Sequence, residues 1–134
     1  MPAVAPHPRP AAVATRDARA RLARMIVRLL DHWAVSTAEQ SALLGLSAAS
    51  RSTLSRYRSG EPLADSRDLI DRAGHLLGIH KSLRILFPHD RDLAYRWMGT
   101  PNVRFGARPV DVVVTRGFEG LLALRRYLDF QRGQ

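Results

Sequence analysis

The chain has 134 residues, 46% of them apolar, which is enough to build one compact core or two very small ones. Its net charge of +9 favours an anionic partner such as nucleic acid. The absence of cysteine excludes disulfides and thiolate metal sites, and no apolar stretch approaches the roughly 20 residues that span a bilayer. We therefore expect a soluble, cytoplasmic protein without a membrane partner.

The first quarter of the chain combines a proline-rich start with a strongly patterned helix. Four prolines stand among the first ten residues, so residues 1–15 are expected to form a disordered tail. From Arg16 to Trp33, apolar residues recur every three or four positions and predict an amphipathic helix. Arg21, Arg24 and Arg28 form a stripe on another face of this helix. Such a stripe is typical of contact with DNA phosphates, with an acidic partner or with water alone.

Two short helices are expected next. Ser36 and Glu39 have the spacing of a capping box, and they start a helix that Gly45 closes. A second helix ends at Gly60. Because glycine suits a tight turn with positive φ, this arrangement predicts a helix-turn-helix, whose second helix can lie in the major groove of DNA.

The second helix of this unit divides into anchoring and exposed side chains. Leu54 and Tyr57 are expected to anchor it to the core, which leaves its polar side chains available for DNA. The candidate DNA-binding residues are Arg51, Ser52, Thr53, Ser55, Arg56 and Arg58. The connection from Ser47 to Ser50 is longer than a compact turn, so the helix starts late or is reoriented. DNA contact and a purely structural role both stay open at this point.

The middle of the chain contains three further helical segments. Apolar spacing predicts a helix from about Ser66 that Gly78 ends, and then a short helix over 83–87 before Pro88. A third segment covers 90–98, and the sequence from Thr100 to Asn102 breaks it.

The remaining segments decide the fold class. The valines of residues 109–114 favour a strand by propensity, whereas Pro109 in a first helical turn and the lack of a partner strand favour a helix. Residues 119–130 place a broad apolar face on a final helix. The expected class is all-α, with a helix-turn-helix region over 16–65 followed by a small helical domain over 66–134.

No pattern in the sequence indicates an enzyme. His75 and His80 are five positions apart with Gly78 between them, a poor spacing for one helix face. The three aspartates between 65 and 71 favour a helix N-terminus rather than acid-base work. The chain has no cysteine nucleophile and no glycine-rich phosphate loop. We expect no catalytic residue, no metal and no cofactor.

Several separated features from residue 76 onward occur in a characteristic order. They are Leu83 with Phe87 before Pro88, Trp97, Pro101-Asn102, Phe105-Gly106, Arg108-Pro109-Val110-Asp111, Gly117, and the closing helix from Leu121 to Gly133. In order and spacing this region resembles the toxin-binding domain of the Xre/MbcA/ParS antitoxin family. From the residue types alone, apart from this resemblance, we expect Trp97, Phe87 and Tyr127 to be core residues, and Asn102 to close a turn.

The resemblance implies an antitoxin of a type II toxin-antitoxin system. Members of the family bind a RES-type toxin that acts on NAD, either by destroying it or by transferring ADP-ribose to a target. The antitoxin obstructs the NAD cleft of the toxin, so this chain need not bind NAD. The resemblance further implies a homodimer within a hetero-oligomer, which represses its own operon. The alternative is a stand-alone helix-turn-helix transcription regulator with the same C-terminal fold.

The candidate toxin-binding residues lie in the last third of the chain. The set that could enter the cleft is Asp129, Phe130, Gln131 and Arg132. The set that could pair with toxin carboxylates is Arg104, Arg108, Arg125 and Arg126, with Asn102 as a further contact. A frayed end with solvated charges is the alternative for any one of these residues.

Overall fold

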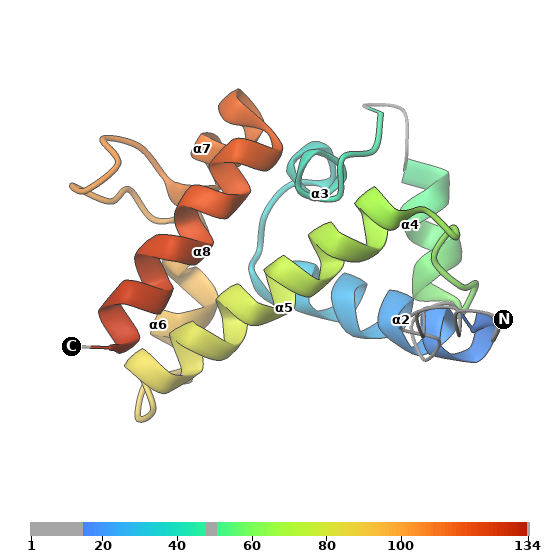
Figure 1. Cartoon of the computed structure of the whole chain (residues 1–134), viewed down its shortest axis with the longest axis horizontal. Coiled ribbons are helices and arrows are strands. Elements are labelled where there is room, and N and C mark those ends of the chain that lie inside the picture. The colour runs from blue at the N-terminus through green and yellow to red at the C-terminus, as the bar shows by residue number, and fades with distance from the viewer. Residues whose placement is uncertain (1–14, 48–50, 134) are drawn as a thin grey trace, which may run out of the picture.

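The computed structural model describes residues 15–47 and 51–133, and its regular elements there are helices (Figure 1). They are α2 (Arg16–His32), α3 (Thr37–Leu43), α4 (Arg51–Arg58), α5 (Arg67–Leu86), α6 (Arg91–Arg96), the 3-10 helix η1 (Trp97–Gly99), α7 (Pro109–Arg116) and α8 (Phe118–Arg132). Within these two ranges no strand forms, which confirms the all-α class and the helical reading of residues 109–114. Two predicted features lie outside the described residues. They are the tail up to residue 14, and Ser50 at the end of the connection before the second helix.

The predicted start signals are present as hydrogen bonds. The Ser36 hydroxyl accepts from the Glu39 backbone N–H at 3.1 Å, and the Glu39 carboxylate accepts from the Ser36 N–H at 2.9 Å. This is the predicted capping box. Gly45 has a φ of +70°, the conformation that favours glycine and turns the chain out of α3.

Helix α5 corrects the prediction for the middle of the chain. It runs unbroken from Arg67 to Leu86, so both the helix end at Gly78 and the separate helix over 83–87 were wrong. A mid-helix glycine costs about 1 kcal/mol relative to alanine, but Leu76, Ile79 and Leu83 on the same helix are fully buried, and their burial outweighs that cost. Gly78 lies directly under the Arg125 guanidinium of α8.

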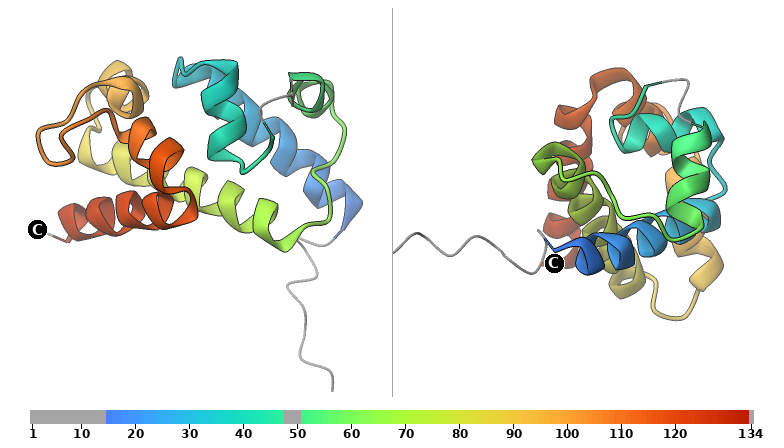
Figure 2. Two further views of the ribbon diagram at one scale, coloured as in Figure 1. Left: turned by 90° about the horizontal axis from the view of Figure 1, so that it is seen from above. Right: turned by 90° about the vertical axis from the view of Figure 1, so that its right-hand side faces the viewer.

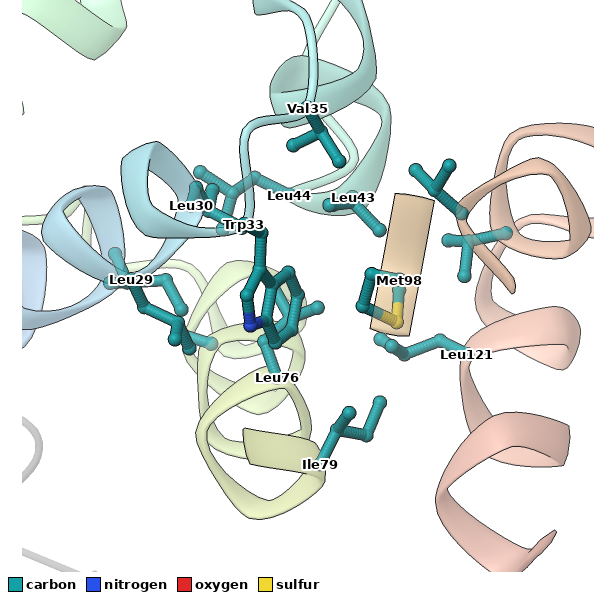
Figure 3. Packing of buried hydrophobic residues seen from close by; sticks show 14 of the residues in the cluster. Leu29, Leu30, Trp33, Val35, Leu43, Leu44, Leu76, Ile79, Met98 and Leu121 are labelled. Atoms are coloured by element: carbon teal, nitrogen blue, oxygen red, sulfur yellow. The ribbon is translucent and has the colours of Figure 1, made fainter. Parts of the chain in front are cut away.

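One apolar core joins both halves of the chain. Trp33 after α2, Leu43 of α3, Leu76 of α5, Met98 of η1 and Leu121 of α8 are almost completely buried in it (Figure 3). Side chains from the beginning and the end of the chain therefore stabilise each other.

Helix α5 forms the long axis of this arrangement. It packs against α2 and α6, and most extensively against α8. Helix α4 and the C-terminal end of α8 consequently lie at opposite ends of the molecule (Figures 1 and 2). The surfaces at these two ends are therefore separate.

A stack of aromatic rings covers one side of the core. The Tyr95 ring stacks on His80 with centroids 5.0 Å apart and on His32 with centroids 4.7 Å apart. Burial lowers the pKa of His80 below its ordinary value of 6.5, and the positive charges of Arg84 and His32 act in the same direction. The buried Nδ1 of His80 has no hydrogen-bond partner among the described residues.

This environment predicts a loss of stability in mild acid. The unfolded chain binds a proton at His80 from pH 6.5 downward, whereas the folded chain resists it. The free energy of unfolding should therefore fall as the pH drops below that value. The substitution His80→Phe keeps a ring against Tyr95 and removes the titrating group. Urea unfolding between about pH 7.5 and 5.5 should show a shallower decline for this variant, and an unchanged decline would contradict the assignment.

Candidate functional site

Helix α4 turns a polar face outward, as the sequence predicts. Leu54 and Tyr57 are buried, with exposed fractions of 1% and 4%, and α4 packs against α2. The predicted anchoring role of these two residues is confirmed. Arg51, Ser52 and Ser55 are exposed on the same helix, so their side chains are accessible to a DNA groove.

Two further candidates on α4 form ion pairs within the chain. Arg56 donates to the Glu61 carboxylate at 2.8 Å and to the Thr53 hydroxyl at 3.3 Å. Arg58 donates to both carboxylate oxygens of Asp31, at 2.9 and 3.1 Å. Exposed pairs of this kind contribute about 0 to 1 kcal/mol each, so either arginine can exchange its partner for a phosphate at little cost.

The Asp31 carboxylate joins the end of α2 to the C-terminal end of α4 through its ion pair with Arg58. Burial acts to raise its pKa, but hydrogen bonds from Arg58 and Gln40 outweigh that effect, and the pKa lies below its ordinary value. Asp31 therefore remains ionised at neutral pH, so that Arg58 has an acidic partner whenever no phosphate is bound.

The arginine stripe of α2 continues this cationic region. Arg21, Arg24 and Arg28 are exposed, and Arg24 and Arg28 share a shallow cavity of about 280 Å³ with Arg58. We call Arg21, Arg24, Arg28 and Arg58 the basic surface. Because it adjoins α4, the basic surface extends the positive charge beside that helix.

The loop between η1 and α7 is shaped by Asn102. Its side-chain oxygen accepts from the Arg104 N–H at 2.8 Å, and its carbonyl accepts from Gly106 at 3.0 Å. Asn102 therefore closes a turn, as predicted, and this turn leaves Val103 and Arg104 exposed.

Aromatic side chains support this loop on α8. The Phe105 and Tyr127 rings lie 5.2 Å apart at a steep angle, and Trp97 stacks on Tyr127 at 6.5 Å. The Arg104 guanidinium lies over the Tyr127 ring at 5.9 Å. Phe87, Trp97 and Tyr127 were predicted as core residues, and the structure places them half-buried at its edge.

A groove runs between this loop, α7 and α8. Its volume is about 770 Å³, which is within the range of sites that hold a ligand or several side chains. The residues that define this α7–α8 groove are Arg104, Phe105, Val112, Arg116, Ala123, Arg126, Tyr127 and Phe130. Three of the predicted toxin-binding residues, Arg104, Arg126 and Phe130, meet here. Sequence reasoning missed Arg116 and Phe105 as site residues, because nothing in their local pattern indicates that α7 folds back on α8.

Three other predicted toxin-binding residues lie on the side of α8 that faces α5. Arg125 contacts the Nδ1 atom of His75 at 3.3 Å and pairs with Asp129 at 3.5 Å. Arg132 donates to the buried Ser82 hydroxyl at 3.3 Å. The sequence-predicted set is therefore divided between two faces of α8, with the half-buried Gln131 near its end.

Comparison with known families identifies both halves of the chain. Residues 12–78 match the antitoxin Xre-like helix-turn-helix domain, and residues 82–133 match the antitoxin Xre/MbcA/ParS C-terminal toxin-binding domain. The chain belongs to the Xre family of antitoxins. The antitoxin is also 35% identical over 107 residues to the uncharacterized protein y4oB of Sinorhizobium fredii (strain NBRC 101917 / NGR234). That similarity covers 79% of the antitoxin and 80% of the relative.

The two matched regions of the antitoxin meet within α5. The first ends at residue 78 and the second begins at residue 82, whereas the sequence places a boundary between residues 65 and 66, just before this helix. The α7–α8 groove lies wholly within the toxin-binding match, and α4 lies wholly within the helix-turn-helix match.

Arg108 links the two matched regions of the antitoxin. Its guanidinium pairs with Asp111 of α7 at 2.8 Å and with Glu39 of the α3 capping box. The hydrogen bonds that Arg108 donates to Asp111 and then to Glu39 raise the pKa of its guanidinium. The pKa of Asp111 is lowered, chiefly by its hydrogen bond from Arg108. Arg108 therefore has two acidic partners within the chain. Its contact with toxin carboxylates stays a prediction.

The described part of the antitoxin offers no evident metal site. Residues 15–47 and 51–133 contain no group of three or more histidine, aspartate or glutamate side chains placed to hold a metal ion. No helix in the same ranges is long and apolar enough to cross a membrane.

Proposed function

We propose that the antitoxin silences a RES-domain toxin that acts on NAD, and that it binds operator DNA as a homodimer to repress its own operon. The observation that carries the proposal is the presence of two accessible surfaces, one in each family domain, at opposite ends of one core. The chain acts in the cytoplasm by binding alone, without catalysis, a cofactor or a bound NAD.

Inhibition of the toxin rests on the exposed end of α8. Phe130 has an exposed fraction of 65%, and Asp129 and Arg132 beside it are also exposed. An exposed aromatic ring among polar groups is typical of a side chain that becomes buried on binding. We propose that this end enters the NAD cleft of the toxin and excludes the nucleotide sterically. Arg104 and Arg126 pair with carboxylates of the toxin, whereas Arg108 and Arg125, which have partners within the chain, position this surface.

DNA binding rests on α4 and the basic surface. Arg51, Ser52 and Ser55 face the bases. Arginine recognises the edge of guanine by hydrogen bonds, and the serine hydroxyl can form a hydrogen bond with several different bases. The arginines of α2 contact phosphates on either side, and this term makes affinity fall with salt. In a homodimer, two copies of α4 would read two half-sites of a palindromic operator.

The substitution Arg56→Ala tests the DNA interface. It removes a cation from α4 and frees the Glu61 carboxylate, which repels phosphate. Affinity for the promoter fragment, measured by fluorescence anisotropy at low salt, should fall about tenfold, whereas affinity for the toxin should not change. Arg91→Ala removes an equivalent charge from α6 at the other end of the molecule and serves as the control. Equal DNA affinity of both variants and the unmodified chain would remove α4 from the interface.

A further inference from the structure

The rim of the α7–α8 groove is cationic. Arg104, Arg116 and Arg126 all line it, and Asp111, the acidic residue beside them, is already paired with Arg108. Arg116 pairs only with the exposed Glu119, and Arg126 forms no ion pair with any described residue. The rim therefore has unneutralised positive charge.

The less exposed part of the groove lining is apolar. We call Val112, which is buried, and Ala123, which is half-buried, the floor of the groove. The half-buried aromatic rings of Phe105 and Tyr127 also line it. Phe130, mostly exposed, stands where the groove meets the end of α8. Apolar surface under a charged rim favours an occupant that has an apolar side chain flanked by carboxylates.

A second copy of this chain fits the groove poorly. The antitoxin has a net charge of +9, so two copies repel each other at a cationic surface. Its aspartates 65, 68 and 71 alternate with Arg67 and Arg72, which pair with two of them. These residues therefore do not provide the acidic and apolar segment that the groove would require from a second copy.

We propose that the α7–α8 groove holds an acidic segment of the toxin, with an apolar side chain on its floor and carboxylates at Arg104 and Arg126. This inference rests on the proposed antitoxin function, and it adds a second contact beside the end of α8 that blocks the cleft. The groove gives affinity and selects the cognate toxin, while the end of α8 excludes NAD.

Two variants and a matched control test the groove. Arg126→Glu reverses a rim charge, and Ala123→Trp places a large ring on the floor. Arg91→Glu makes the same charge reversal on exposed α6, outside the groove. The probe is the purified product of the gene adjacent to that of the antitoxin, and dissociation constants are measured by calorimetry at two salt concentrations. Circular dichroism melting shows whether each variant folds.

The groove assignment predicts a specific pattern of affinities. Arg126→Glu should bind the toxin at least about tenfold more weakly, with a smaller salt dependence, because like charges then meet across the interface. Ala123→Trp should weaken binding as well, and Arg91→Glu should bind as the unmodified chain does. The proposal would be overturned if both groove variants fold and bind the toxin as tightly as the unmodified chain. It would also be overturned if Arg126→Glu no longer self-associates but keeps its affinity for the toxin. Failure of the unmodified chain to bind would instead overturn the proposed function.

Discussion

The substitution Gly120→Ala is expected to lower the free energy of unfolding by about 2 to 3 kcal/mol, because it forces α7 and α8 apart. A Cβ atom at position 120 would overlap the Val112 carbonyl oxygen and lie 2.9 Å from its carbonyl carbon. Both atoms belong to the backbone of α7, so the overlap cannot be relieved by a side-chain rotation. Guanidinium or urea unfolding monitored by circular dichroism measures the change.

The matched control is the same substitution at Gly74 of α5. A Cβ atom there would have no neighbour within 4 Å, and the position is exposed in a helix. Gly74→Ala should therefore raise the free energy of unfolding by up to about 1 kcal/mol. Equal effects of the two substitutions would show that α7 and α8 do not pack as closely as described. That result would also remove the groove between them.

Deletion of residues 129–134 is expected to abolish toxin inhibition while the fold persists. Leu128 is the last fully buried residue of α8, and the deletion removes the exposed Asp129, Phe130 and Arg132 beyond it. If Phe130 is a central contact, affinity for the toxin should fall about 30-fold or more. Growth rescue on co-expression and the dissociation constant measure the two parts of this prediction.

A shorter deletion separates inhibition from folding. Removal of residues 133–134 alone keeps α8 to its end at Arg132 and should retain inhibition. The longer deletion also removes the contacts of Asp129 and Arg132 with Ser82. Because it removes no fully buried apolar side chain, its thermal unfolding midpoint should decrease only slightly. Unfolding of this variant would show that the end of α8 is structural. Full inhibition by the folded variant would contradict the occlusion mechanism.

Local signals in the sequence predicted much of the fold. The capping box of Ser36 and Glu39, the turn at Gly45 and the buried faces of α2 and α4 depend on residues within one or two helical turns. The order of motifs between Leu83 and Gly133 was sufficient to predict the antitoxin family.

The missed features depend on contacts between distant parts of the chain. Gly78 has the sequence signature of a helix end, yet the burial of Leu76 and Ile79 against other elements keeps α5 continuous. The groove requires α7 to fold back on α8, and the pairing of Arg108 with Glu39 joins residues 69 positions apart. The division of the α8 arginines between the groove and α5 likewise follows from packing, so charge alone could not separate Arg126 from Arg125.

Co-expression of the antitoxin with the product of the adjacent gene tests the central claim most directly. The readout is growth of the cells, together with co-purification of the two proteins. The account predicts that the adjacent protein arrests growth alone, and that the antitoxin restores growth and co-purifies with it as a stable complex. Absence of both rescue and complex, with both proteins expressed and folded, would contradict the antitoxin function and favour a stand-alone helix-turn-helix regulator.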